Sequence, residues 1–269
     1  MIRTALSAAL VLTLAACSEK KAAETPAAGS AAPSPNAPAT AAPGAGEQRE
    51  PVVAAPAGPT GGVEGEVRFT GPVPEATALQ RSSDPVCAKK QFNDEQLVVK
   101  GEKIQNVVVR VVDKVPGTGA PPATPVILDQ LDCMYRPRVQ GAVRGQAVMI
   151  KNSDGTLHNV HSYEGTKTGF NLAQPPRANP IEKKLQAASD VVKMKCDVHP
   201  WMTGYVVLSD HPFFATTGEE GKFSIQGLPA GKYTLEAWHE SLGTKKAEAV
   251  ITAHGVTQVR FDYALDDKG

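Results

Sequence analysis

The residues best suited to chemistry lie in a short segment, residues 195–202, which reads KCDVHPWM. Within it, Cys196, His199 and Met202 follow a C-x2-H-x2-M spacing. A thiolate and a thioether are soft ligands, and imidazole suits copper in either oxidation state. His158, which lies upstream after a turn of sequence NSDG, offers a second imidazole. We therefore predict one soft-metal site built from these four side chains.

Two separate segments resemble the type 1 copper proteins of the cupredoxin family, in its amicyanin- and plastocyanin-like branch. One is the loop above, in which Pro200 follows the histidine and Trp201 precedes the methionine. The other is LHNVH at residues 157–161, preceded by a strand–glycine–strand pattern over residues 138–152. The resemblance covers about residues 126–210 and implies a Greek-key β-sandwich.

The resemblance also implies a role for each residue of the two motifs. Met202 would be the axial ligand of a single copper ion, and Asn159 would link the two ligand-bearing segments by hydrogen bonds. His161 matches a position that does not bind the metal. Four protein ligands leave no open position for a substrate, so we expect electron transfer and no enzymatic activity. The ligands in the copper plane would be His158, Cys196 and His199.

Other interpretations of the same residues stay open. Zinc also binds Cys-x2-His, although structural zinc usually takes several thiolates and Met is a poor zinc ligand. A disulfide at Cys196 would exclude this residue as a ligand. A copper-binding or copper-delivery lipoprotein of metal homeostasis would need the same ligands but no redox partner. A structural surface module with a vestigial site would need no functional ligands and no redox partner.

The N-terminus predicts export and a lipid anchor. Arg3 precedes a short apolar stretch, and residues 14–17 read LAAC, which resembles the bacterial lipoprotein box. We expect cleavage before Cys17 and lipidation of this residue, with a plain secretory signal as the alternative. The protein would then be periplasmic or on the cell surface, attached to a bacterial membrane by its lipid.

Export also changes how the other cysteines are interpreted, because an oxidising compartment permits disulfides. The sequence holds four cysteines in all. With Cys17 lipidated and Cys196 assigned to the metal, Cys87 and Cys133 are free to pair. The alternative is that both are buried thiols.

The pattern of residues along the chain predicts an all-β fold with two sandwiches. Residues 1–16 form the signal, and residues 17–60 form an Ala/Pro-rich tether that cannot bury enough apolar surface to fold. Short strands separated by turns follow, as in sandwiches. Residues 211–265 carry G-x-F and L-P-x-G-x-Y signatures that resemble the carboxypeptidase regulatory-like, transthyretin-type sandwich. This smaller sandwich would begin in residues 61–125, with the cupredoxin, residues 126–210, inserted between its two parts.

The partners are predicted from charge and from the resemblance. Net charge is zero, which argues against nucleic acid as a partner. The resemblance implies that His199 reaches the surface through an apolar patch beside Trp201, where a redox protein docks over a small area. Trp201 as a core residue is an equal alternative. His161, His211 and His239 raise the question of a second metal, but we expect a structural histidine at each position.

Overall fold

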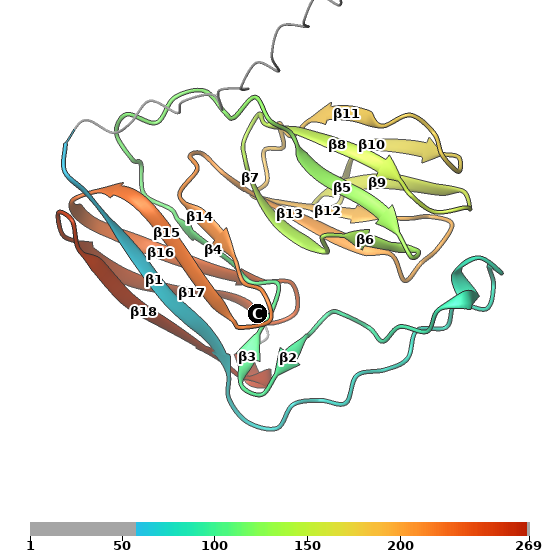
Figure 1. The fold of residues 1–269 in the computed structure, drawn as a ribbon, viewed down its shortest axis with the longest axis horizontal. Coiled ribbons are helices and arrows are strands. Elements are labelled where there is room, and N and C mark those ends of the chain that lie inside the picture. The colour runs from blue at the N-terminus through green and yellow to red at the C-terminus, as the bar shows by residue number, and fades with distance from the viewer. Residues whose placement is uncertain (1–57, 268–269) are drawn as a thin grey trace, which may run out of the picture. The chain divides into compact units, whose positions relative to one another are not determined.

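The computed structural model describes residues 58–267, and this part of the chain is almost entirely β-structure (Figure 1). The fold is therefore all-β, as predicted. The signal peptide, Cys17 and nearly all of the predicted tether lie outside the described residues. Within residues 58–267, no helix has the length and apolar character needed to cross a membrane.

The first sandwich consists of two sheets that enclose one core. One sheet has the order β15-β1-β3-β2, with β18 also pairing with β1, and the other has the order β14-β4-β16-β17. Burial alternates along β16, as expected for a strand with one face on a core. The first sheet contains β1 (Thr60–Phe69), β2 (Val99–Lys100), β3 (Lys103–Ile104), β15 (Lys222–Pro229) and β18 (Val256–Tyr263). The second contains β4 (Val108–Val111), β14 (Phe214–Thr216), β16 (Gly231–His239) and β17 (Gly243–Ile251).

The second sandwich is built from the chain between β4 and β14. Its sheets have the orders β10-β9-β12-β13-β7 and β11-β8-β5-β6. The first sheet contains β7 (Val139–Val143), β9 (His158–Glu164), β10 (Lys167–Gln174), β12 (Val191–Lys195) and β13 (Thr203–Ser209). The second contains β5 (Val126–Leu131), β6 (Met134–Arg136), β8 (Ala147–Asn152) and β11 (Ile181–Lys184). β11 pairs antiparallel with β8 at the edge of this sheet.

A long connection between β1 and β2 pairs as a strand with neither sandwich. Residues 70–98 hold a single isolated bridge, Ala78 to Asn93, and a short 3-10 helix, η1 (Cys87–Lys89). This connection leaves the first sandwich and packs against the second (Figure 1), to which Cys87 is joined by a disulfide. It therefore carries side chains of the first part of the chain to the loops of the second sandwich.

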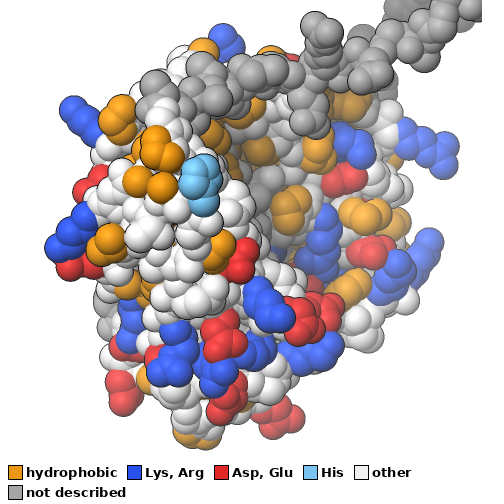
Figure 2. Space-filling view, turned by 60° about the vertical axis from the view of Figure 1, so that its left-hand side comes forward, with side chains coloured by type: hydrophobic (Ala, Val, Ile, Leu, Met, Phe, Trp, Pro, Cys, Tyr) orange, Lys and Arg blue, Asp and Glu red, His pale blue; other side chains and the backbone are white. Residues whose placement is uncertain are grey.

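Side chains of both charge signs are interspersed on the face that Figure 2 shows, with no extended region of one sign. Among the described residues, several charged side chains form ion pairs, for example Lys232 with Glu248 at 2.9 Å. The mixed surface agrees with the zero net charge of the sequence.

Candidate metal centre

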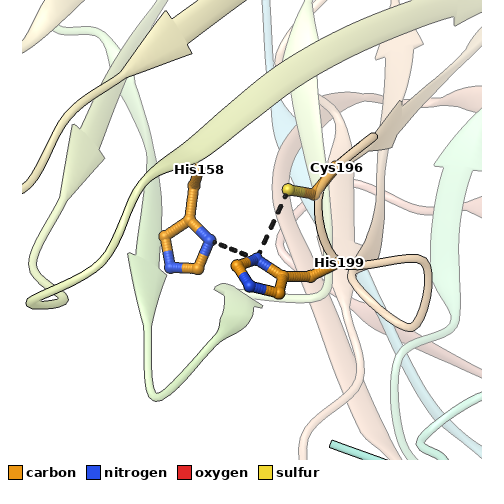
Figure 3. Close-up of side chains that lie close together, drawn as sticks. All are labelled: His158, Cys196 and His199. Atoms are coloured by element: carbon orange, nitrogen blue, oxygen red, sulfur yellow. Dashed lines mark hydrogen bonds between the residues drawn. The ribbon is translucent and has the colours of Figure 1, made fainter. Parts of the chain in front are cut away.

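Two adjacent strands of the second sandwich bring the predicted ligands together. His158 is the first residue of β9, and Cys196 directly follows β12, which pairs antiparallel with β9. His199 lies in the loop that leads from β12 to β13 (Figure 3). All three side chains are buried, with exposed fractions of 0% for His158 and 1% for the other two.

The loop from Cys196 to Met202 is held by its own backbone. The Cys196 N–H donates to the carbonyl oxygen of Met202 at 3.2 Å, and the Met202 N–H donates to that of His199 at 2.9 Å. Met202 is fully buried and belongs to the same apolar core as Cys196. The tight loop between β12 and β13 therefore holds its potential ligands close together at the core of the second sandwich.

The three ligand atoms face one another. The Nδ1 atoms of His158 and His199 are 2.9 Å apart, and the Cys196 Sγ lies 3.8 Å from the His199 Nδ1 (Figure 3). One donor atom from each of the three residues lies within 4.8 Å of the other two. Such a buried group of two imidazoles and one thiol is the donor set that soft or borderline metal ions take.

A carboxylate oxygen lies within hydrogen-bonding distance of the other nitrogen of each imidazole. The His158 Nε2 lies 2.9 Å from the Asp154 Oδ2, and the His199 Nε2 lies 3.1 Å from the Asp84 Oδ2. With its proton on Nε2, each imidazole donates a hydrogen bond to a carboxylate and keeps its lone pair on Nδ1. Two lone pairs at 2.9 Å repel unless a cation lies between them, so the residues present fit a bound metal ion.

Asp154 is itself fixed by the turn between β5 and β6. Its two oxygens accept the backbone N–H groups of Asp132, at 2.8 Å, and Cys133, at 2.7 Å. Burial raises the pKa of this carboxyl, but the hydrogen bonds from His158 and the two N–H groups outweigh burial and hold the pKa below its ordinary value. Asp154 is therefore an ionised acceptor for His158.

Asp84 is fixed in the same way from the β1–β2 connection. Its Oδ1 accepts the N–H groups of Val86, at 2.7 Å, and Cys87, at 3.3 Å, while its Oδ2 accepts the Thr156 hydroxyl at 2.7 Å. Burial alone would raise the pKa of Asp84, but these bonds and His199 lower the pKa to about 2. A permanent negative charge thus lies at the outer edge of His199.

The environment also favours the thiolate form of Cys196. Burial raises the pKa of this thiol, but hydrogen bonds from His158 and from nearby backbone N–H groups outweigh burial and lower the pKa. Burial lowers the pKa of His158, yet Asp154 and the thiol raise it above its usual value. For His199, burial and the neighbouring His158 prevail over Asp84, and the pKa is lowered. The pKa shifts of the two histidines therefore run in opposite directions, as expected for two imidazoles that face each other at short distance.

Asn159 makes the kind of link that the resemblance implies. Its Oδ1 accepts the Asp197 N–H at 2.6 Å, and its Nδ2 donates to the Asp197 Oδ2 at 2.9 Å. These bonds tie β9 to the loop after β12, next to two of the ligands. The other histidines of interest lie outside the cluster. His161 contacts the Asp197 carboxylate at 3.1 Å, while His211, between β13 and β14, and His239, at the end of β16, are buried elsewhere.

The structure joins Cys87 to Cys133 in a disulfide and leaves Cys196 as the free thiol of the described residues. The Cys87 Sγ lies 3.7 Å from the His199 Nε2, so the bridge lies directly beside the site. With its sulfur free, Cys196 is available as a ligand.

The predicted exposure of His199 is wrong. Its imidazole is buried because Asp84 and Cys87 cover the edge that would otherwise face solvent. Trp201 is half-buried: its ring centre lies 5.0 Å from that of His199, and its Nε1–H donates to the Cys133 carbonyl oxygen at 3.0 Å. Trp201 therefore packs against the core, as its alternative interpretation holds.

Sequence reasoning missed both carboxylates. Asp154 lies four residues before His158 in a turn, a spacing that offered a weak signal. Asp84 lies 115 residues from His199 and has no motif around it. The one available signal was the possible pairing of Cys87 with Cys133, because a disulfide would bring this segment close to the second sandwich.

No protein-family model matches this chain, and neither does any curated protein. Among solved structures, a purple cupredoxin from Nitrosopumilus maritimus is 23% identical, with 31% of this chain and 99% of that chain covered and a TM-score of 0.28. Amicyanin from Paracoccus versutus is 16% identical, with 38% and 97% covered and a TM-score of 0.29. An amicyanin variant in its reduced Cu(I) form is 21% identical, with 36% and 97% covered and a TM-score of 0.28. Scores this low establish neither family nor function.

Proposed function

We propose that the protein carries single electrons through one copper ion bound by His158, Cys196 and His199, with Met202 as the axial ligand. The convergence of two Nδ1 atoms and one thiol on a buried point supports this function most directly. Copper, when bound, alternates between Cu(II) and Cu(I) and so takes up or releases one electron.

The side chains would serve this function by staying in place. The backbone bonds of the 196–202 loop and the two carboxylates restrain the ligands before any metal arrives. A site that already has the ligand geometry changes little between the two oxidation states, which favours rapid electron exchange. Burial excludes water, so that no substrate position remains beside the ligands.

A redox protein is the proposed partner, and a lipid at Cys17 is the proposed anchor to a bacterial membrane. Apolar residues next to the ligands in sequence are exposed, with Leu157 at 45% and Val198 at 48%, and Pro200 is also exposed. They offer a small apolar surface of the kind used in weak electron-transfer complexes. The described first sandwich contributes to the site through the β1–β2 connection, and we propose a supporting role for it.

The test is to add Cu(II) to the purified protein and record its absorption and its reversible one-electron potential. We expect an intense visible band from thiolate-to-copper charge transfer, and we expect Cys196→Ser to abolish it. His161→Gln is the matched control, because this histidine lies outside the ligand group, and it should keep the band. A colourless wild-type protein would refute the proposal, and fast loss of copper to acceptor proteins without a reversible potential would favour copper delivery instead.

A further inference from the structure

We propose that Asp84 is a positioning residue for the metal site and that residues 84–87, fixed by the Cys87–Cys133 disulfide, form a closed cap over His199. The role of this cap rests on the proposed function, because it acts on a proposed copper ligand. Its geometry, however, is a property of the protein without metal.

Asp84 contacts both chain segments that carry the ligand histidines. Its Oδ2 faces the His199 Nε2 at 3.1 Å and also accepts the hydroxyl of Thr156, which lies two residues before His158. Its backbone carbonyl accepts the Ala88 N–H at 2.9 Å, which starts the short helix η1. One side chain thus connects the β1–β2 connection to both segments that carry the ligand histidines.

The Cys87–Cys133 disulfide links the two carboxylates that face the ligand imidazoles. The N–H of Cys87 donates to Asp84, and the N–H of Cys133 donates to Asp154. Each half of the bridge is therefore hydrogen-bonded to one of the two carboxylates that face the imidazoles. A single covalently closed unit holds both Nε2 acceptors and so aims both Nδ1 atoms at the same point.

The residues on either side of the cap anchor it to the second sandwich. Arg81 is buried and donates to the carbonyl oxygens of Lys90, at 3.0 Å, and Asp132. Its guanidinium lies over the ring of Phe92 at 4.9 Å, a distance typical of cation–π contacts. The Lys90 ammonium pairs with the Asp132 carboxylate at 2.6 Å, so the cap is joined to the β5–β6 turn by charge as well as by the disulfide.

These contacts predict two properties of the site. His199 is expected to carry its proton on Nε2, because the Asp84 Oδ2 lies 3.1 Å from Nε2 and can accept a hydrogen bond from it. Asp84 and Cys87 cover the Nε2 edge of His199 and hold the imidazole in place, so we expect copper bound at Nδ1 to leave slowly. Loss of an outer partner of a metal-bound histidine typically costs 10- to 100-fold in metal affinity.

The experiment compares Asp84→Ala and Asp84→Asn in the full chain with Asp94→Ala. Asp94 is a matched control because it lies on the same connection and accepts a backbone N–H, that of Gln96, at 2.9 Å, but it does not touch the site. Mass mapping of the Cys87–Cys133 bridge and circular dichroism establish that each variant is folded.

The first readout is the histidine tautomer in the metal-free protein, measured by nitrogen-15 NMR at alkaline pH, where imidazoles are neutral. We expect His199 and His158 to hold the proton on Nε2 in the wild type and in Asp94→Ala. Asp84→Ala should release this preference at His199 alone, and Asp84→Asn, which keeps an acceptor oxygen, should largely retain it. A wild-type tautomer at His199 in Asp84→Ala would overturn the proposal, and this result does not depend on copper binding.

The second readout is the transfer of Cu(II) from the loaded protein to a chelator such as EDTA. We expect transfer about 10- to 100-fold faster in Asp84→Ala than in the wild type, with Asp84→Asn between them and Asp94→Ala unchanged. Equal rates of copper transfer in Asp84→Ala and Asp94→Ala would overturn the proposed role of the cap. If the wild type never takes up copper, the proposed function fails, while the tautomer measurement still decides the role of Asp84.

Discussion

Each ligand imidazole has two differently used nitrogens: Nδ1 faces the other ligands and Nε2 faces a carboxylate. Because both outer carboxylates are ionised, the ligand nitrogens are set before a metal arrives. Met202, buried in the same core as Cys196, is the remaining donor of the loop. Its proposed role is weaker than that of the other three, since axial thioethers bind copper at long range.

Met202→Leu tests that axial role. Leucine fills a similar volume but cannot donate to copper, so the visible band should persist while the reduction potential rises, because Cu(II) loses more ligand stabilisation than Cu(I) does. Cyclic voltammetry measures the change. Met194→Leu, also fully buried in this core, is the control and should leave the potential nearly unchanged. An unaltered potential in Met202→Leu would remove Met202 from the ligand set.

His239 predicts a pH dependence of stability in the first sandwich. Burial, together with the nearby Arg138, lowers the pKa of His239 from 6.5 to about 4, and its Nδ1 accepts the N–H groups of Ser241 and Leu242. Because the unfolded chain binds the proton more tightly, the contribution of His239 is complete above pH 6.5 and is lost as pH falls toward 4. The loss is on the order of 3 kcal/mol.

Chemical unfolding at several pH values measures this loss. His239→Asn keeps an acceptor in place of Nδ1 but cannot titrate, so its free energy of unfolding should vary less between pH 6.5 and 4 than that of the wild type. His254→Asn, at an exposed position, should follow the wild type. Parallel curves for the wild type and His239→Asn would show that His239 does not contribute.

At the scale of elements, the site depends on how β9 is tied to the loop after β12. Asn159 supplies that tie through the backbone N–H and the carboxylate of Asp197. We expect Asn159→Ala to weaken copper binding by roughly 10- to 100-fold in a competition titration, because both ligand-bearing segments gain freedom. Asn171→Ala is the control: its side chain contacts Asn159 and the Asp197 carboxylate but not the loop backbone, and its effect should be smaller. Equal effects of the two changes would contradict the account.

The ligand loop was predictable because its donors lie within seven residues and their chemistry is specific. That His158 lies beside this loop followed only from the resemblance, and the pairing of β9 with β12 that brings it there was not predicted. The cap could not be predicted, because the contact of Asp84 with His199 joins residues 115 positions apart and depends on where a disulfide holds an irregular connection. The exposure of His199 was predicted wrongly for the same reason.

At the scale of the molecule, the two sandwiches meet through a buried ion pair. Arg138, next to β7, donates to both carboxylate oxygens of Glu240, which follows β16, at 2.6 and 2.8 Å. The two side chains are 4% and 3% exposed. Removing one partner of such a pair leaves an uncompensated charge in the protein interior.

We therefore expect Arg138→Met and Glu240→Leu each to lower the free energy of unfolding by about 3–5 kcal/mol, while the double variant loses less than either single change. Denaturant unfolding of the three variants measures this difference. The control is Lys232→Ala, which breaks an exposed pair with Glu248 and should cost less than about 1 kcal/mol. Additive losses in the double variant would show that the two side chains do not act as a pair.

We propose that one copper ion is bound by two imidazoles and the Cys196 thiolate. X-ray absorption at the copper edge tests this ligand set most directly. In the loaded wild-type protein, we predict one short sulfur neighbour and two nitrogen neighbours per copper ion, with the sulfur lost in Cys196→Ser. A copper shell made only of nitrogen and oxygen in the wild type, or a short sulfur neighbour that survives in Cys196→Ser, would contradict this ligand set.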